Sequence, residues 1–174
     1  MKFKLAIGDK IYSTWSLRPW LVLKYFNIPF DELKIKLRNK DTKKKILRIS
    51  PSGKVPCLIY GKIKIWDSLS ICEFLAEKFK NKNLWPKNNH DKILARNLSS
   101  EMHSGFANLR KNLSMNFLKK KLKFQKKRET LAEITRAKNI IENCLKKSNG
   151  PFMFKKFSIV DAMYVPVMFR FKIY

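Results

Sequence analysis

The sequence predicts a two-domain protein, with a mixed α/β domain over residues 1–80 followed by an all-helical domain over residues 92–174. Three observations predict this class. Before residue 80, short apolar segments of strand composition alternate with segments of helical spacing, in the order β-α-β-α-β-β-α. After residue 91, apolar residues recur at steps of three and four, as on one face of a helix. Residues 81–91 between them are polar and rich in Asn, so we expect a linker.

The elements of the first domain follow from its apolar pattern. We expect a strand over 3–7, a helix over 16–26, a strand over 33–37, a short helix over 42–49, a hairpin over 55–60 and 62–66, and a helix over 67–79. Gly61 supplies the tight turn of the hairpin. This order is typical of the thioredoxin-like fold, a four-stranded mixed sheet covered by helices. An ordinary α/β sandwich has the same periodicity, so both alternatives remain open here.

Two apolar stripes and a capping motif predict the helices of the second domain. The first stripe comprises Leu94, Leu98, Met102, Phe106, Leu109 and Leu113, and the second comprises Leu131, Ile134, Ala137, Ile141 and Leu145. Asn149-Gly150-Pro151 ends the second helix, because Gly and Pro stop helices. A capping box from Ser158 to Asp161 begins a third.

Size and cysteine content limit the compartment. With 174 residues and 45% apolar composition, the chain can bury one sizeable core or two small ones. No run approaches the roughly 18 apolar residues that span a bilayer, and the first residues lack a signal-peptide cleavage site. Cys57, Cys72 and Cys144 are odd in number and form no C-x-x-C pair. We therefore expect reduced thiols, no metal and a cytoplasmic location.

The formal net charge of +26 raises the question of an anionic partner. Lysines and arginines number 39, but only 8 of them are Arg, the residue on which specific base contacts depend. Runs such as Lys43–Lys45, Lys119–Lys121 and Lys126–Lys127 are most simply solvated surfaces. We expect no specific nucleic-acid partner and no membrane partner, although salt-dependent DNA binding through the lysine excess remains an alternative.

Three segments carry residues suited to holding a small ligand. Residues 12–18 place hydroxyl groups near a helix N-terminus, where an anion such as a thiolate is favoured; simple helix capping is the alternative. Val55-Pro56 is a candidate cis peptide whose backbone could pair with an extended ligand, or a plain trans proline at a strand edge. Asp67-Ser68 begins a helix and offers a hydroxyl and N–H groups to a carboxylate, or only caps that helix.

Taken together, these residues resemble the glutathione S-transferase family over nearly the whole chain. The motifs that carry the resemblance are the Ser-x-x-Ser-x-Arg turn at 13–18, Ser50 to Pro56, Trp66 to Ile71, Leu84-Trp85-Pro86, Glu101 to Phe106 and Phe157 to Ala162. The chain is most similar to bacterial members of the serine-type, zeta-like branch. The resemblance implies a thioredoxin-like glutathione-binding domain followed by an all-α domain of the family that is C-terminally short.

The resemblance also implies residue roles. Ser13 would be the catalytic hydroxyl that hydrogen-bonds the glutathione thiolate. Lys54 would lie near the glycyl end, and Val55 would pair with the cysteinyl backbone beside cis-Pro56. Asp67 and Ser68 would hold the γ-glutamyl group, although the family more often has Glu or Gln where Asp67 stands. The box at Ser158 and Asp161 resembles a folding signature of the family, with a role in stability.

The implied activity is conjugation of the glutathione thiolate to electrophilic small molecules, with glutathione as co-substrate and a homodimer as the expected assembly. Related chemistries stay open, namely glutathione-dependent isomerisation of a double bond and disulfide reduction. Because the family usually continues through further helices after the one that begins at Ser158, a non-catalytic, truncated protein of the same fold is a further alternative.

Overall fold

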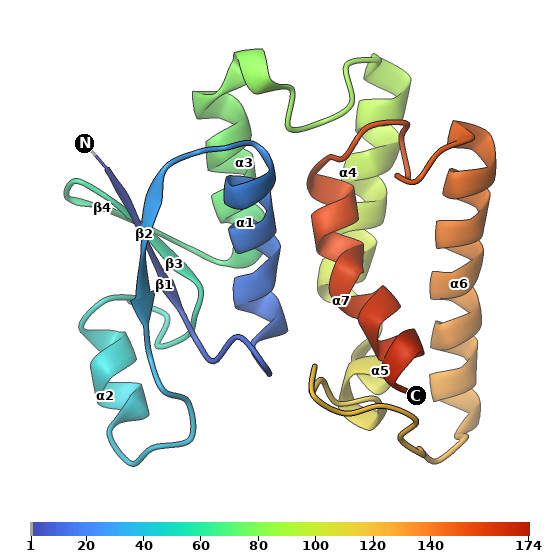
Figure 1. Cartoon of the computed structure of the whole chain (residues 1–174), viewed down its shortest axis with the longest axis horizontal. Helices are drawn as coiled ribbons and strands as arrows, with labels where there is room; N and C mark the ends of the chain where they lie inside the picture. Colours follow the sequence, from blue (N-terminus) through green and yellow to red (C-terminus); the bar gives the residue numbers. More distant parts are fainter. Residues whose placement is uncertain (1) are drawn as a thin grey trace. The chain divides into compact units, whose positions relative to one another are not determined.

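The computed structural model describes residues 2–174. The chain divides into two compact units, the first ending at Lys82 and the second spanning Asn83–Tyr174 (Figure 1). Each unit has its own buried core. We describe each by itself.

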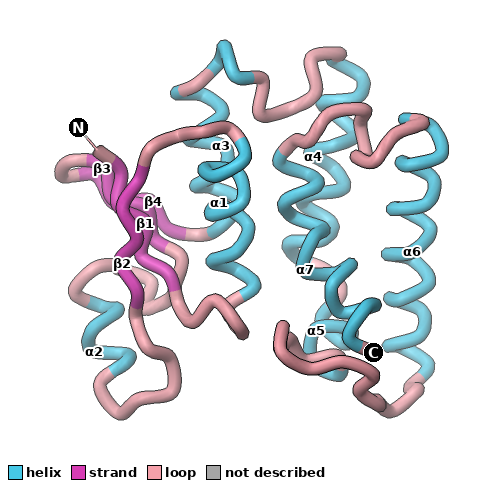
Figure 2. The backbone as a smooth tube through the Cα atoms, viewed as in Figure 1, coloured by secondary structure: helices cyan, strands magenta, loops and turns pink. Residues whose placement is uncertain are grey.

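The first unit is built on a four-stranded mixed sheet. Its strands are β1 (Phe3–Ile7), β2 (Phe30–Lys34), β3 (Cys57–Tyr60) and β4 (Ile63–Trp66), in the spatial order β2-β1-β3-β4 (Figure 2). Strand β1 runs parallel to β2 and antiparallel to β3, and β3 and β4 form an antiparallel hairpin. The predicted order β-α-β-α-β-β-α and the thioredoxin-like sheet are thereby confirmed.

Helices cover both faces of this sheet. Helices α1 (Thr14–Tyr25) and α3 (Ser68–Lys78) lie together on one face, and the short α2 (Thr42–Leu47) lies on the other (Figure 1). Alternation along β1 explains the division, because successive side chains of a strand point to opposite faces. Phe3 stacks edge-on against Phe74 of α3, whereas Ala6 packs with Ile46 of α2. Strand β1 is therefore buried on one face along its length and on the other face at Ala6, while Lys4 is exposed.

Strand β2 begins and ends three residues before the predicted strand over 33–37. Its parallel register pairs Phe3 with Phe30 and Ile7 with Lys34, and β1 ends there. The apolar alternation continues past that point: the N–H of Ile35 still donates to the carbonyl of Ile7 at 2.9 Å, and the N–H of Leu37 donates to the Asp9 carboxylate at 2.9 Å. Strand β2 therefore ends where its partner β1 ends. The apolar pattern of β2 does not contain this information.

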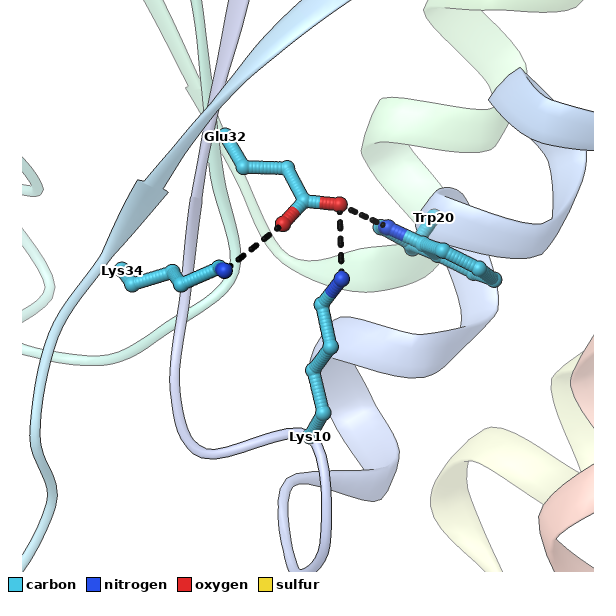
Figure 3. A network of polar contacts seen from close by, with 4 residues as sticks. All are labelled: Lys10, Trp20, Glu32 and Lys34. Atoms are coloured by element: carbon cyan, nitrogen blue, oxygen red, sulfur yellow. Dashed lines mark hydrogen bonds and ion pairs between the residues drawn. The ribbon is translucent and has the colours of Figure 1, made fainter.

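A polar network ties β2 to α1 and the loop before it (Figure 3). The carboxylate of Glu32 accepts hydrogen bonds from the indole N–H of Trp20 at 2.6 Å and from the ammonium of Lys10 at 2.9 Å. Lys34 lies 3.8 Å from its second oxygen. Burial alone would raise the pKa of Glu32, but the hydrogen bonds and the two cations outweigh it and lower this pKa. The carboxylate is thus the form that the folded unit favours.

We expect Glu32→Gln to lower the free energy of unfolding by about 1 kcal/mol at neutral pH, since it weakens two charge-assisted hydrogen bonds at a partly exposed site. Because the pKa of Glu32 is lowered on folding, this stabilisation is present above the ordinary glutamate range and is lost as the pH falls through the folded-state value. Urea unfolding at neutral and acidic pH measures both effects. Glu142→Gln is the matched control, because Glu142 only pairs with exposed Lys138 at 3.6 Å. An equal loss in both variants would contradict the expectation.

The second unit is helical. It contains α4 (Asn89–Ser104), α5 (Ala107–Asn112), α6 (Arg128–Ser148) and α7 (Ile159–Ile173), and a short 3-10 helix, η1 (Lys80–Lys82), ends the first unit. Helix α4 packs on α7 and α5 packs on α6. Within residues 81–91, Leu84 and Trp85 are buried, and the Asn88 side chain caps α4 by accepting from the N–H of Asp91. No helix within residues 2–174 combines the length and the apolar composition that crossing a bilayer requires.

The first apolar stripe is split between two helices. Helix α4 ends at Ser104, Gly105 is extended, and Phe106 takes a left-handed conformation with φ of 56° before α5 begins. A side chain at Gly105 would place its Cβ 2.7 Å from the carbonyl oxygen of Glu101. The guanidinium of Arg110 donates to the carbonyls of Met102 and Gly105, which holds the corner. The spacing from Leu94 to Leu113 thus reflects two helices that share one core.

The predicted capping box at the start of α7 is confirmed. Asp161 is 4% exposed and accepts hydrogen bonds from the N–H of Ser158 and the N–H of Met153, both at 2.8 Å. The Ser158 hydroxyl also donates to it at 3.2 Å. One buried carboxylate therefore joins the preceding loop to the first turn of α7. Burial raises the pKa of Asp161, and its hydrogen bonds oppose that rise in part.

Candidate functional site

The sheet brings the three segments that were predicted to bind a ligand to one end of the first unit. In the register, Ala6 of β1 faces Cys57 of β3, and Cys57 faces Trp66 of β4. The loop that leads to Ser13 leaves β1 one residue after Ala6. Val55-Pro56 precedes Cys57, and Asp67-Ser68 follows Trp66. Neighbouring strands lie about 4.8 Å apart, so all three segments begin from one short row across the sheet.

Ser13 stands directly before α1, at a helix start where N–H groups and the macrodipole favour an anion. Although it is the N-cap residue, its side chain makes no capping hydrogen bond. Its hydroxyl donates instead to the hydroxyl of Ser16 at 2.9 Å, and Ser16 in turn accepts from the N–H of Gly8 at 3.2 Å. Ser13 is half-buried and Ser16 is buried. The Ser13 oxygen is thus held beside a helix N-terminus and keeps its acceptor capacity.

Gly8 packs closely against the turn that carries Ser13. A Cβ atom at this position would lie 3.1 Å from the Cβ of Ser13 and 2.7 Å from Cδ1 of Leu37. The shorter contact would push the end of the Leu37 side chain aside, and the contact with Ser13 is tighter than ordinary van der Waals packing. The turn after β1 needs glycine for space rather than for a left-handed backbone.

A buried cation lies beneath the same turn. Arg18 is fully buried, its guanidinium donates to the carbonyl of Thr14 at 2.9 Å, and it stacks 4.2 Å from the ring centroid of Trp15. The positive charge of Arg18 lowers the pKa of the Cys72 thiol in α3, and the negative charge of Asp67 raises this pKa. The Ser-x-x-Ser-x-Arg spacing contains Arg18 but does not indicate that its side chain is buried. The structure makes it part of the support for α1 and α3.

The Val55–Pro56 peptide bond is cis, as predicted. The side chain of Val55 packs against the buried cluster beneath α2, which consists of Ala6, Ile35, Ile46 and Cys57. This contact fixes the segment to the sheet. Within residues 2–174, the backbone N–H and C=O of Val55 make no hydrogen bond. A segment with both groups available can pair with an extended ligand in the manner of an added strand.

Lys54 precedes this segment and is exposed. Gly53 has a φ of 65°, a conformation that glycine adopts without strain, and its N–H donates to the carbonyl of Ser50 at 3.0 Å. The N–H of Lys54 donates to the hydroxyl of Ser52 at 3.3 Å. The Gly53 turn therefore presents Lys54 to solvent beside Val55.

Asp67 and Ser68 differ in their environments. Asp67 is exposed and caps α3, with one carboxylate oxygen accepting from the N–H of Leu69 at 2.9 Å and of Ser70 at 3.2 Å. Its backbone has a φ of 72°, a strained value for a residue other than glycine. Ser68 is 1% exposed, and its hydroxyl has no hydrogen-bond partner within residues 2–174. A buried hydroxyl without a partner is costly, and a bound polar group is one explanation for it.

The cysteines do not form a reactive centre. Cys57, Cys72 and Cys144 are all buried and unbridged. Burial is the largest influence on each thiol, and it raises the pKa of all three. Thiolates are the reactive form, so these side chains behave as small apolar residues at neutral pH. Among residues 2–174, no group of three His, Cys, Asp or Glu side chains could hold a metal.

A cavity of about 470 Å³ lies in the second unit and is separate from these segments. It is lined mainly by apolar side chains of α6, α7 and the loop before α6: Leu113, Phe124, Ile134, Ile141, Met168 and Phe171. Lys138 and Glu142 stand at its edge. It contains none of the residues predicted to hold a ligand, and its lining does not suit a charged peptide.

Comparison with known proteins agrees with the geometry of the first unit. Residues 12–78 match the model of the family "Glutathione S-transferase, N-terminal domain". Glutathione S-transferase Z2 of Arabidopsis thaliana is 28% identical over 170 residues, covering 92% of this chain and 72% of that protein. The "Probable maleylacetoacetate isomerase" of Caenorhabditis elegans is 31% identical over 108 residues, covering 62% of this chain and 50% of that protein. The chain spans about half the length of the first curated relatives it matches.

Solved structures extend the likeness to both units. A glutathione transferase homologue from Burkholderia, solved with bound glutathione, has a TM-score of 0.74 and 17% identity, over 98% of this chain and 80% of that one. The fold is therefore that of the glutathione transferases, in which a thioredoxin-like domain is followed by a helical domain. The match of residues 12–78 to the N-terminal domain of the glutathione S-transferases agrees with the resemblance of the first unit to this family. These similarities do not distinguish the bacterial serine-type branch from other branches of the family.

Proposed function

We propose that this protein is a glutathione transferase of the serine-type, zeta-like branch that conjugates the glutathione thiolate to electrophilic small molecules. The observation that carries the proposal is the row Ala6, Cys57 and Trp66, from which the Ser13 turn, Val55-Pro56 and Asp67-Ser68 all depart. One peptide ligand could touch all three segments at once.

Each segment suits a different part of glutathione. The Ser13 hydroxyl would donate to the thiolate after turning from Ser16, and the start of α1 would favour the negative charge. The N–H and C=O of Val55, which have no protein partner within residues 2–174, would pair with the cysteinyl backbone, next to cis-Pro56. The exposed ammonium of Lys54 would lie near the glycyl carboxylate.

The γ-glutamyl end would lie at the start of α3. There the buried Ser68 hydroxyl without a partner and the N–H groups of the first turn would meet its carboxylate, and Asp67 would face its ammonium. Asp67 caps α3 as well, so the two alternatives for this residue are compatible. The shorter side chain of Asp67, in place of Glu or Gln, still accepts hydrogen bonds.

Isomerisation is the second candidate function. The match to the maleylacetoacetate isomerase of Caenorhabditis elegans and to the Z2 transferase of Arabidopsis favours it. In that reaction the thiolate would add to a conjugated cis double bond, rotation would follow, and elimination would release the trans isomer and the thiolate. Disulfide reduction has less support, because burial keeps the pKa of every cysteine of the chain high.

We expect glutathione at about 100 times its dissociation constant to stabilise the folded chain by about 2.7 kcal/mol and to raise the melting midpoint by roughly 5–10 °C. Cysteinylglycine, which lacks the γ-glutamyl group, should give a much smaller shift. Ser68→Ala should lower the glutathione shift, and Ser104→Ala, an exposed serine bonded only to the Ser100 carbonyl, should not. A folded chain whose midpoint does not respond to glutathione would favour the non-catalytic alternative.

Rates then separate the chemistries once binding is shown. Conjugation of glutathione to chlorodinitrobenzene without isomerisation of maleylacetone would support the first candidate, and the reverse would support the second. Cytoplasmic location, detoxification and a homodimer belong to the same proposal.

A further inference from the structure

We propose that the loop between α5 and α6, residues 113–127, docks the protein on an anionic lipid surface. We call this segment the basic loop; it is the long pink connection between α5 and α6 in Figure 2. A lysine excess spread over a whole chain selects no surface, which is why composition alone gave no reason to expect a membrane partner. The structure adds where these charges stand and how the loop is held.

The charge of the basic loop is dense and unopposed. Six exposed lysines lie within it: Lys119, Lys120, Lys121, Lys123, Lys126 and Lys127. Exposed Arg128 follows at the start of α6, and no acidic residue occurs between Glu101 and Glu129. Within residues 2–174, none of these cations forms an ion pair. Anionic lipid headgroups attract such clusters with about 1 kcal/mol for each cation near the surface.

The loop is anchored at several points, so its charges are presented by a fixed platform. The N–H of Leu122 donates to the carbonyl of Ile173 at 2.9 Å. The ring of Phe117 packs 4.8 Å from that of Phe169 in α7. Fixed charges lose less conformational freedom on docking than the charges of a free tail.

A second anchor lies further along the loop. The ring of Phe124 packs edge-on 5.9 Å from that of Tyr174. The Tyr174 hydroxyl donates to the carbonyl of Ser114 at 3.1 Å. The aromatic residues of the loop therefore face the helical unit, and its lysines remain in solvent.

One apolar side chain is the exception. Leu118 is 74% exposed, and it immediately precedes the run Lys119–Lys121. A local turn holds it there: the Asn116 side chain accepts from the N–H of Leu118 at 3.0 Å, and the carbonyl of Asn116 accepts from the N–H of Lys119 at 3.1 Å. A bilayer interface offers anions for the lysines and an apolar layer for Leu118. A nucleic acid offers only the anions, and the aromatic rings that would stack on bases are occupied within the protein.

The test is sedimentation of the full chain with vesicles of phosphatidylcholine alone or with one third phosphatidylserine. We expect binding only to the anionic vesicles, and weaker binding as salt is added. Replacing Lys119, Lys120 and Lys121 by Gln should weaken it roughly a hundredfold. Leu118→Ser should weaken it about tenfold, because the apolar contact is lost. These side chains are exposed, and far-ultraviolet circular dichroism verifies that the variants fold.

The matched control is the same triple change at Lys43, Lys44 and Lys45, exposed lysines of α2 in the first unit. It removes the same charge from another place and should leave vesicle binding within a few-fold of wild type. Equal losses in the two triple variants would overturn the proposal, since net charge alone would then explain binding. So would an unchanged affinity of Leu118→Ser, or duplex DNA that displaces the vesicles through the same lysines.

A second readout tests insertion directly. A fluorophore can be attached selectively to Leu118→Cys, because the native cysteines are buried and label slowly. If this fluorophore is sensitive to its environment, its emission should shift to the blue and brighten with anionic vesicles, since position 118 enters the apolar layer. A fluorophore on Lys43→Cys should not change. An unchanged signal at position 118 would show that no side chain enters the interface, which contradicts the proposal.

Discussion

Ser13→Ala is expected to lower the rate of glutathione-dependent catalysis by about 10²–10³-fold. The hydroxyl is proposed to donate to the sulfur at the start of α1, and its removal takes away one preorganised donor to an anion. The pKa of the bound thiol should rise, because its charged form loses a partner. With the protein saturated with glutathione, the pH profile of kcat/KM for the electrophile should therefore move to higher pH. A purely structural role for Ser13 would not produce this change.

Three further variants make the Ser13 experiment specific. Ser13→Thr keeps a hydroxyl at the position and should retain more activity than Ser13→Ala. Ser16→Ala removes the acceptor that holds the Ser13 hydroxyl, so we expect a smaller loss with the same sign. Ser104→Ala should leave the rate unchanged. If Ser13→Ala kept both its rate and its pH profile while it still bound glutathione, Ser13 would not be the catalytic group.

Local sequence signals account for the parts of the fold that were predicted correctly. Strand β1 is short, apolar and followed by a loop signal, and it lies at 3–7 in both descriptions. The capping box of α7 is encoded by two residues three apart, Ser158 and Asp161. The Val55-Pro56 pair was a candidate for the cis peptide, and the family resemblance implied it. Each of these features depends on neighbours in the chain, which a single sequence contains.

The features that were missed depend on partners distant in sequence. The end of β2 is set by the end of β1, and the corner at Gly105 is held by Arg110 from the next helix. Leu84 and Trp85 are buried in the helical unit even though the surrounding residues are polar.

The candidate site shows the same division. Its three segments could be named from motifs, but the chain of hydroxyls from Ser13 to Ser16 and Gly8 could not. The motif also could not show that the Ser68 hydroxyl has no hydrogen-bond partner within residues 2–174. Orientation of a side chain follows from tertiary packing, and the residue pattern does not report it.

Asp161→Ala is expected to lower the free energy of unfolding by about 2–5 kcal/mol, because it leaves the buried N–H groups of Ser158 and Met153 without acceptors. This is a large part of the roughly 5–15 kcal/mol that holds a folded domain together. Asp161→Asn should cost less, since the amide keeps one acceptor oxygen but turns an N–H toward another donor. Denaturant unfolding followed by circular dichroism measures both variants.

The matched control is Asp41→Ala. Asp41 is the N-cap residue of α2, is exposed and makes no side-chain capping bond, so its removal should change stability by less than about 0.5 kcal/mol. The pH dependence gives a separate check. Because burial raises the pKa of Asp161 in the folded state, folding takes up a proton in the window just above the ordinary aspartate range. The contribution of Asp161 to stability therefore falls as the pH rises through that window, and Asp161→Asn should abolish this slope. Equal losses for Asp161→Ala and Asp41→Ala would show that the buried hydrogen bonds of Asp161 do not account for the effect, because Asp41 makes none.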